Sequence, residues 1–134
     1  MEKKIYTHRV WDATTQNTGV EAIDKHHVKF VEIINQLVDI LNGAESEDNT
    51  LDVIHKLLYY AESYFIEEEL YFRSIKYANL SSHQKSHRGF LDSVLNFQQN
   101  YKNNPEPVRI EMMKFLDRWY KEHILGDDLK AVPH

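Results

Sequence analysis

Four stretches of the chain carry core-type residues at intervals of three and four, the period of one face of an α-helix. These stretches span about residues 20–41, 49–76, 79–101 and 106–125. Along the first stretch, one side is formed by Ile23, His27, Phe30, Ile34, Leu37 and Leu41. Each stretch therefore predicts a helix that buries one face against the rest of the molecule.

The segments between these stretches are short and carry residues that end or begin helices. Asn42-Gly43 is a usual helix stop, Asn79 or Ser81 can cap the third helix, and Pro105 suits the first turn of the last. Helices joined by short links pack as antiparallel neighbours. The sequence therefore predicts one all-α domain over residues 1–134, an up-down-up-down four-helix bundle. An irregular N-terminal arm (1–19) precedes it, and Trp11 packs that arm onto the bundle.

Composition supports this fold and narrows the function. Four glycines and three prolines in 134 residues leave little turn chemistry for a sheet. A net charge of −5 does not favour nucleic acid or an anionic membrane surface as a partner. Since no apolar run approaches the roughly 20 residues of a membrane span, we expect a cytoplasmic protein.

Candidate chemistry begins with His83 and His87, which lie four residues apart near the start of the third helix. At this spacing two imidazoles project from one helix face, where they can bind one metal ion. Two surface histidines would show the same spacing, so the pair alone does not establish a site. The chain has no cysteine, so any metal must be bound by nitrogen and oxygen.

Counting residues from the loops indicates which side chains share a layer of the bundle. At about 1.5 Å per residue, His27 and Tyr64 lie at one level measured from the loop between the first two helices, and His87 and His123 share a level measured from the loop between the last two. His83 lies near the same level, just after the link between the second and third helices. These side chains are therefore predicted to converge.

Two carboxylates join this layer. Glu68 lies one turn after Tyr64, and Asp128 follows Gly126, where an irregular turn can direct it back over the last helix. So many ionisable groups cannot be buried together unless a metal neutralises them. Two carboxylates among histidines in a helical bundle suggest two bridged ions, and the mixed donors suit iron or manganese.

The chain resembles the bacterial haemerythrins over nearly its whole length. The matching motifs are Ile23-Asp24-Lys25-His26-His27, Tyr60 with Tyr64-Phe65-Ile66-Glu67-Glu68-Glu69, His83-Gln84-Lys85-Ser86-His87, and Trp119 with His123-Ile124-Leu125-Gly126-Asp127-Asp128. The resemblance implies a non-haem diiron centre, oxo- or hydroxo-bridged, that binds dioxygen reversibly.

The resemblance also implies how the ligands are divided. One iron would be fully coordinated and the other, which takes ligands from the first two helices, would keep an open position. Glu68 and Asp128 would bridge the two. The implied metal ligands are His27, Tyr64, Glu68, His83, His87, His123 and Asp128.

Tyr64 departs from the family, which has histidine at this position. Three interpretations are open. Tyr64 binds as a tyrosinate, which lowers the charge of the site by one, favours ferric iron and weakens oxygen carriage. Alternatively, the tyrosine points aside and leaves the second iron more open, or the site binds another metal or a single ion.

Neighbouring polar residues have plainer interpretations. His26, where the family usually has glutamine, points about 100° away from His27, so we expect it behind the ligands or on the surface. Glu67 and Glu69 flank Glu68 and are expected to be solvated charges.

Three functions remain open on the sequence. The first is a non-haem diiron protein that binds dioxygen or a related small molecule for storage, transport or sensing, without being an enzyme. The second is a diiron redox enzyme that acts on peroxide or nitric oxide. The third is a helical interaction protein with a degenerate site.

Overall fold

A computed structural model describes residues 5–128, and its main elements are four long helices. They are α2 (Glu21–Leu41), α3 (Thr50–Ser74), α4 (Leu80–Tyr101) and α5 (Pro105–Arg118), and the last continues into a π-helical segment, η2 (Trp119–Asp128). A short helix, α1 (Ala13–Gln16), precedes them, and a single 3-10 turn, η1 (Glu47–Asn49), leads into α3.

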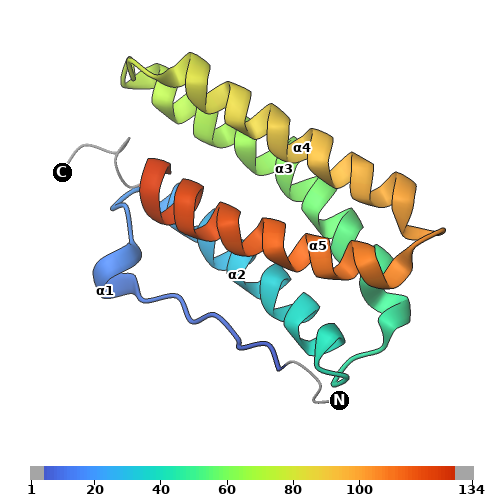
Figure 1. The fold of residues 1–134 in the computed structure, drawn as a ribbon. Coiled ribbons are helices and arrows are strands. Elements are labelled where there is room, and N and C mark those ends of the chain that lie inside the picture. The colour runs from blue at the N-terminus through green and yellow to red at the C-terminus, as the bar shows by residue number, and fades with distance from the viewer. Residues whose placement is uncertain (1–4, 129–134) are drawn as a thin grey trace.

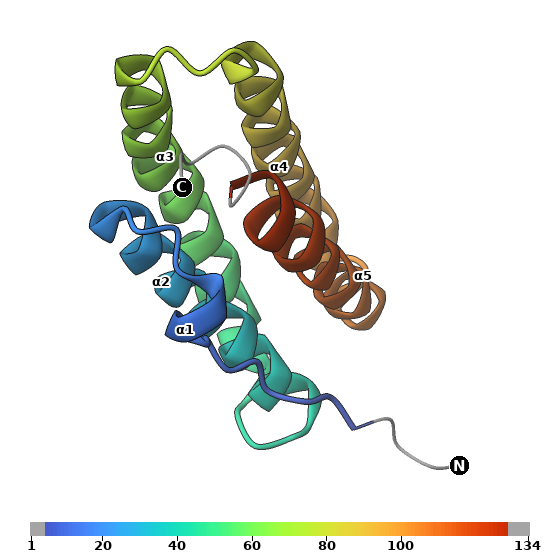
Figure 2. The same ribbon diagram turned by 90° about the vertical axis from the view of Figure 1, so that its left-hand side faces the viewer.

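The four long helices pack as a closed ring of neighbours: α2 against α3, α3 against α4, α4 against α5, and α5 against α2 (Figures 1 and 2). Each runs opposite to the one before it, because the links between them are short. The predicted all-α four-helix bundle is therefore confirmed. None of the described helices is long and apolar enough to cross a membrane.

The core consists of two apolar clusters. The larger contains fully buried side chains from all four helices, among them Phe30, Ile34, Leu37, Ile54, Leu57, Phe90, Val94, Met112 and Leu116. The smaller, Ile23 with Phe72, lies toward the α3–α4 link and packs against Leu80. Polar side chains that lie between the two clusters are thus shielded from water at both ends.

The N-terminal arm lies along the bundle (Figure 1), and its described part, from residue 5, is held by two side-chain amides, one within α2 and one just after it. Asn35 accepts from the Arg9 amide and donates to the Arg9 carbonyl, at 2.7 and 2.8 Å. Asn42 holds the backbone of Tyr6 in the same two-way manner. Trp11 packs against the core, as predicted.

The C-terminal end of the last helix differs from the prediction, which ended it near residue 125 with an irregular turn after it. Instead, helical structure continues through Asp128 with π winding. In an α-helix, residues five apart point about 140° away from each other, but π winding pairs residue i with i+5. The wider turn therefore brings Asp128 over His123, where an α-helix would turn it away.

Candidate metal centre

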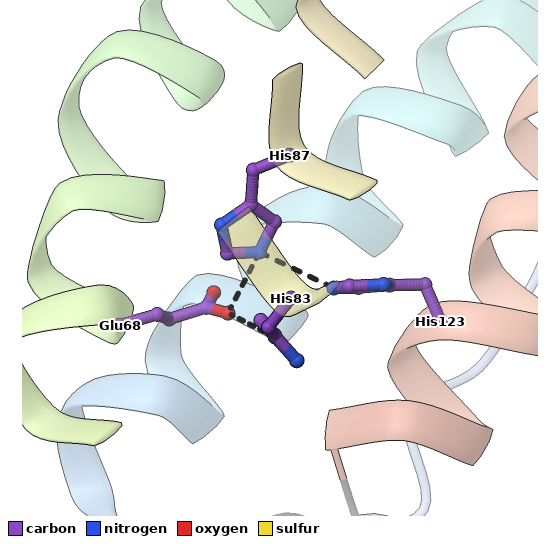
Figure 3. A group of neighbouring side chains, drawn as sticks. All are labelled: Glu68, His83, His87 and His123. Atoms are coloured by element: carbon purple, nitrogen blue, oxygen red, sulfur yellow. Dashed lines mark hydrogen bonds and ion pairs between the residues drawn. The ribbon is translucent and has the colours of Figure 1, made fainter. Parts of the chain in front are cut away.

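Six of the seven predicted ligands are almost completely buried in one layer between the two apolar clusters. They come from α2, α3, α4 and η2, and their exposed fractions are: His27 0%, Glu68 1%, His83 4%, His87 3%, His123 3% and Asp128 1%. Figure 3 shows four of them converging from three helices. The depth estimate made from residue counts is thus matched by the geometry.

One group of donors is formed by three histidines and a glutamate: Glu68, His83, His87 and His123, whose ligand atoms all lie within 4.8 Å of one another. The Glu68 Oε1 atom lies 3.7 Å from His87 Nε2 and 4.0 Å from His83 Nε2. His87 Nε2 and His123 Nε2 face each other at 3.3 Å. Two imidazole nitrogens that converge in this way can both turn lone pairs toward one ion.

A second group consists of His27, Glu68 and Asp128, also within 4.8 Å of one another. Glu68 belongs to both groups. Asp128 connects them as well, because its Oδ2 lies 2.8 Å from His27 while its Oδ1 lies 2.8 Å from His83 and 3.2 Å from His123. Two carboxylates that each face both groups could bridge two ions.

The two carboxylates have opposite electrostatic environments. Burial and the neighbouring Asp128 carboxylate raise the pKa of Glu68 above its usual value. Burial would also raise the pKa of Asp128, but His123, His27 and His83 are so close that they lower it well below the usual range. The surroundings thus favour the charged form of Asp128 and disfavour the charged form of Glu68.

The histidines show the same division. Burial, followed by repulsion from His123 and His83, lowers the pKa of His87 to about 2, so its imidazole is neutral at pH 7. For His83, burial is outweighed by the hydrogen bond and charge of Asp128, which raise its pKa. A neutral imidazole is the form that binds a metal ion.

The buried polar atoms themselves fit a bound metal. Within the described residues, both carboxylate oxygens of Glu68 are buried and lack a hydrogen-bond partner. Leaving such atoms unsatisfied in a core costs about 1–3 kcal/mol each, so native proteins rarely do it. Metal ions bound by these atoms would satisfy them together.

Aromatic rings enclose the site. Phe65 stacks on His87, with ring centroids 3.9 Å apart and planes 5° from parallel, and Trp119 stacks on His123 at 3.9 Å and 16°. Trp11 from the N-terminal arm lies 5.5 Å from the His27 ring. These contacts fix the imidazole orientations and exclude water from their faces.

The seventh predicted ligand, Tyr64, lies half-buried beside this layer. Its ring stacks face to face on His26, with centroids 4.2 Å apart and planes 5° from parallel. It also contacts the edges of Tyr59 and Tyr60. The binding of metal by the Tyr64 oxygen stays a prediction.

Three acidic residues next to Glu68 or Asp128 contact the outward nitrogens of histidines, which the sequence analysis missed. Glu67 lies 2.8 Å from His26 Nε2, and Glu69 lies 3.5 Å from His87 Nδ1. Asp127 lies 3.5 Å from His123 Nδ1. The sequence contained a signal for these contacts, because each acidic residue lies one position before or after Glu68 or Asp128.

Comparison with known proteins agrees with this geometry. Residues 18–134 match the family model described as Hemerythrin HHE cation binding domain. A Bacteriohemerythrin of Clostridium acetobutylicum is 36% identical over 118 residues, which cover 85% of this chain and 92% of that protein.

Two further relatives extend the comparison. A Bacteriohemerythrin of Pseudomonas aeruginosa is 34% identical over 130 residues, covering 95% of this chain and 83% of that protein. A Myohemerythrin of Theromyzon tessulatum is 32% identical over 120 residues, covering 90% and 88%. No solved structure matches the chain significantly. The family model and the relatives show that the chain belongs to the hemerythrin family.

Proposed function

We propose that this protein binds two iron ions and uses them to bind dioxygen or a related small molecule. The observation that carries the proposal is that two carboxylates each face both donor groups. Glu68 belongs to both groups, and the two oxygens of Asp128 face different histidines. Two ions bridged by carboxylates in a helical bundle account for both features.

The two ions would have unequal numbers of protein ligands. His83, His87 and His123 would hold one ion together with the two carboxylates, whereas His27 and the same carboxylates would hold the other. The second ion therefore has room for a donor from the neighbouring His26–Tyr64 pair and for a small molecule from outside. When bound, the pair of irons supplies the redox chemistry that dioxygen binding requires.

The protein's own residues orient the imidazoles and exclude water from the site. The rings of Phe65 and Trp119 fix two imidazoles and keep water from their faces. The carboxylates of Glu69 and Asp127 face the outward nitrogens of the same histidines, an arrangement that orients metal-bound imidazoles and raises their basicity.

If Tyr64 binds the second ion, as the sequence predicts, it sets the oxidation state that this ion favours. As a tyrosinate it would place an anionic oxygen where the family has a neutral nitrogen. Because this favours ferric iron, reversible oxygen carriage would be weakened, and redox turnover of peroxide or nitric oxide would become the alternative function.

The test is an iron assay with the visible spectrum of the aerobically purified protein, followed by anaerobic reduction and exposure to air. Two irons per chain and an oxygenated species that reverses under vacuum support the proposal. His83→Ala should lose iron, whereas His55→Ala, which removes an exposed histidine of α3, should retain it. Failure of the wild-type protein to bind iron would refute the proposed function.

A further inference from the structure

We propose that the ion held by His27 takes its additional ligand from the imidazole nitrogen of His26 and not from the phenol oxygen of Tyr64. This inference rests on the proposed diiron function and concerns the ligand set of the second ion. It follows from three structural features that His26 has in common with His87, a histidine of the first group.

The first shared feature is burial under an aromatic ring. His26 is only 6% exposed. Neither its position in the sequence nor the polarity of its side chain predicts that it is buried. Tyr64 stacks on its ring at 4.2 Å and 5°, as Phe65 stacks on His87 at 3.9 Å and 5°. The Tyr64 ring therefore covers the face of His26 as the Phe65 ring covers the face of His87.

The second shared feature is a carboxylate at the outward nitrogen. Glu67 lies 2.8 Å from His26 Nε2, closer than the 3.5 Å that separates Glu69 from His87 Nδ1. A carboxylate at this position accepts the ring proton and leaves the lone pair on the other nitrogen. For His26, that other nitrogen is Nδ1.

The third shared feature is the direction of the inward nitrogen. His26 Nδ1 is buried, has no hydrogen-bond partner among the described residues, and lies 3.8 Å from Glu68 Oε2. On the other side of the same carboxylate, His87 Nε2 lies 3.7 Å from Oε1. The two oxygens of Glu68 thus face different imidazoles, Oε2 that of His26 and Oε1 those of His87 and His83.

A separation of 3.8 Å is too long for a hydrogen bond but suits two donors that share one ion. Nitrogen and oxygen ligands lie about 2 Å from a first-row metal ion, so two of them lie up to about 4 Å apart. Glu68 would then bridge by giving Oε1 to the ion of His87 and Oε2 to the ion of His26.

Tyr64 is placed to support this donor. Its face covers the His26 ring and the Tyr60 ring lies nearly perpendicular to it, so it is held by rings on two sides. The chain thus has an additional imidazole at position 26 beside the position where the family's imidazole is missing. Because the neutral nitrogen of His26 takes the place of the neutral histidine nitrogen that the family has at position 64, the charge of the site is unchanged and oxygen carriage is retained.

The experiment compares His26→Gln with Tyr64→Phe, using iron content, visible spectra and resonance Raman spectra of the reconstituted proteins. The phenylalanine keeps the stacked ring and removes only the phenol oxygen. We expect Tyr64→Phe to keep two irons per chain and an unchanged spectrum, and His26→Gln to fall toward one iron. His55→Gln, an exposed histidine on α3, controls for the loss of a surface imidazole.

Circular dichroism of the metal-free proteins shows whether His26→Gln folds, and Glu67→Gln provides a second variant that leaves the imidazole in place. We expect Glu67→Gln to weaken iron binding about 10- to 100-fold.

The wild-type spectrum gives an independent result that needs no variant. Two irons without a phenolate-to-iron charge-transfer band support the inference, whereas such a band, lost in Tyr64→Phe, overturns it in favour of Tyr64. Two irons retained in His26→Gln also overturn it. Absence of iron from the wild-type protein refutes the proposed function instead.

Discussion

Replacing Glu68 with leucine should have opposite effects on the metal-free and the iron-loaded protein. The carboxylate is central to both donor groups, so its loss should abolish the binding of two irons. In the metal-free protein the same carboxylate is a buried polar group without a hydrogen-bond partner among the described residues. Leucine has a similar helix propensity and a similar size, so it can fill the position without straining α3.

The size of the effect follows from burial. Glu68 is 1% exposed, and burial together with Asp128 raises its pKa, so its charged form is disfavoured in the metal-free fold. The remaining cost of an unsatisfied buried polar group is about 1–3 kcal/mol. We expect metal-free Glu68→Leu to be more stable than the metal-free wild type by about this amount. For a domain of this size, that corresponds to a melting temperature higher by roughly 3–15 °C.

The assay is thermal unfolding followed by circular dichroism, on chelator-treated protein and again after iron is added anaerobically. Glu62→Leu is the matched control, because it removes an exposed carboxylate from the same helix. It should change the free energy of unfolding by no more than about 0.5 kcal/mol and should leave the response to iron intact.

A metal-free Glu68→Leu protein that melts at or below the wild-type temperature would refute the reasoning, because it would mean that the carboxyl is satisfied without metal. A full response of this variant to iron would refute the bridging role of Glu68.

Three other perturbations test separate parts of the molecule. Removing iron from the wild-type protein with a chelator should lower its melting temperature, because ligands that bind only the folded state stabilise it; an unchanged temperature in differential scanning calorimetry would contradict this. Asp117→Asn should cost about 0.2–1 kcal/mol at pH 7 in urea unfolding, because the carboxylate holds Arg9 of the arm at 2.7 Å. Burial would raise the pKa of Asp117, but hydrogen bonds from Arg9 and Lys121 lower it, so the wild-type advantage is present at neutral pH and should shrink as the pH falls below 3.8. Ile34→Ala, at a fully buried core position, should cost about 2–5 kcal/mol in the same assay, and a loss below 1 kcal/mol would mean that the core collapses around the cavity.

The helices and the layer of the site could be predicted because both depend on local periodicity. Apolar residues at intervals of three and four define the four long helices, and α2 ends at Leu41 as the Asn42-Gly43 signal indicates. In an antiparallel bundle the depth of a side chain follows from its distance along the helix, so residue counts sufficed to bring His27, His87 and His123 together.

The environments of individual polar residues could not be predicted in this way. His26 was expected behind the ligands or on the surface, and the structure buries it between Tyr64, Glu67 and Glu68. Glu67 is exposed, as expected, but its carboxylate also lies 2.8 Å from the outward nitrogen of this histidine, a contact that the sequence did not indicate. Such contacts depend on which helix lies opposite and how its side chains pack, and helical period alone does not specify this.

The sequence by itself determined the helices, their antiparallel order and the set of nitrogen and oxygen donors, because these follow from periodicity, loop length and the absence of cysteine. Only the tertiary structure decided how individual polar side chains are oriented in this layer. The π winding of η2 brings Asp128 to 3.2 Å from His123, and the packing of α2 against α3 turns His26 toward Glu68. Both depend on contacts between helices that are distant in sequence, where the free energy of packing, and not local propensity, selects the geometry.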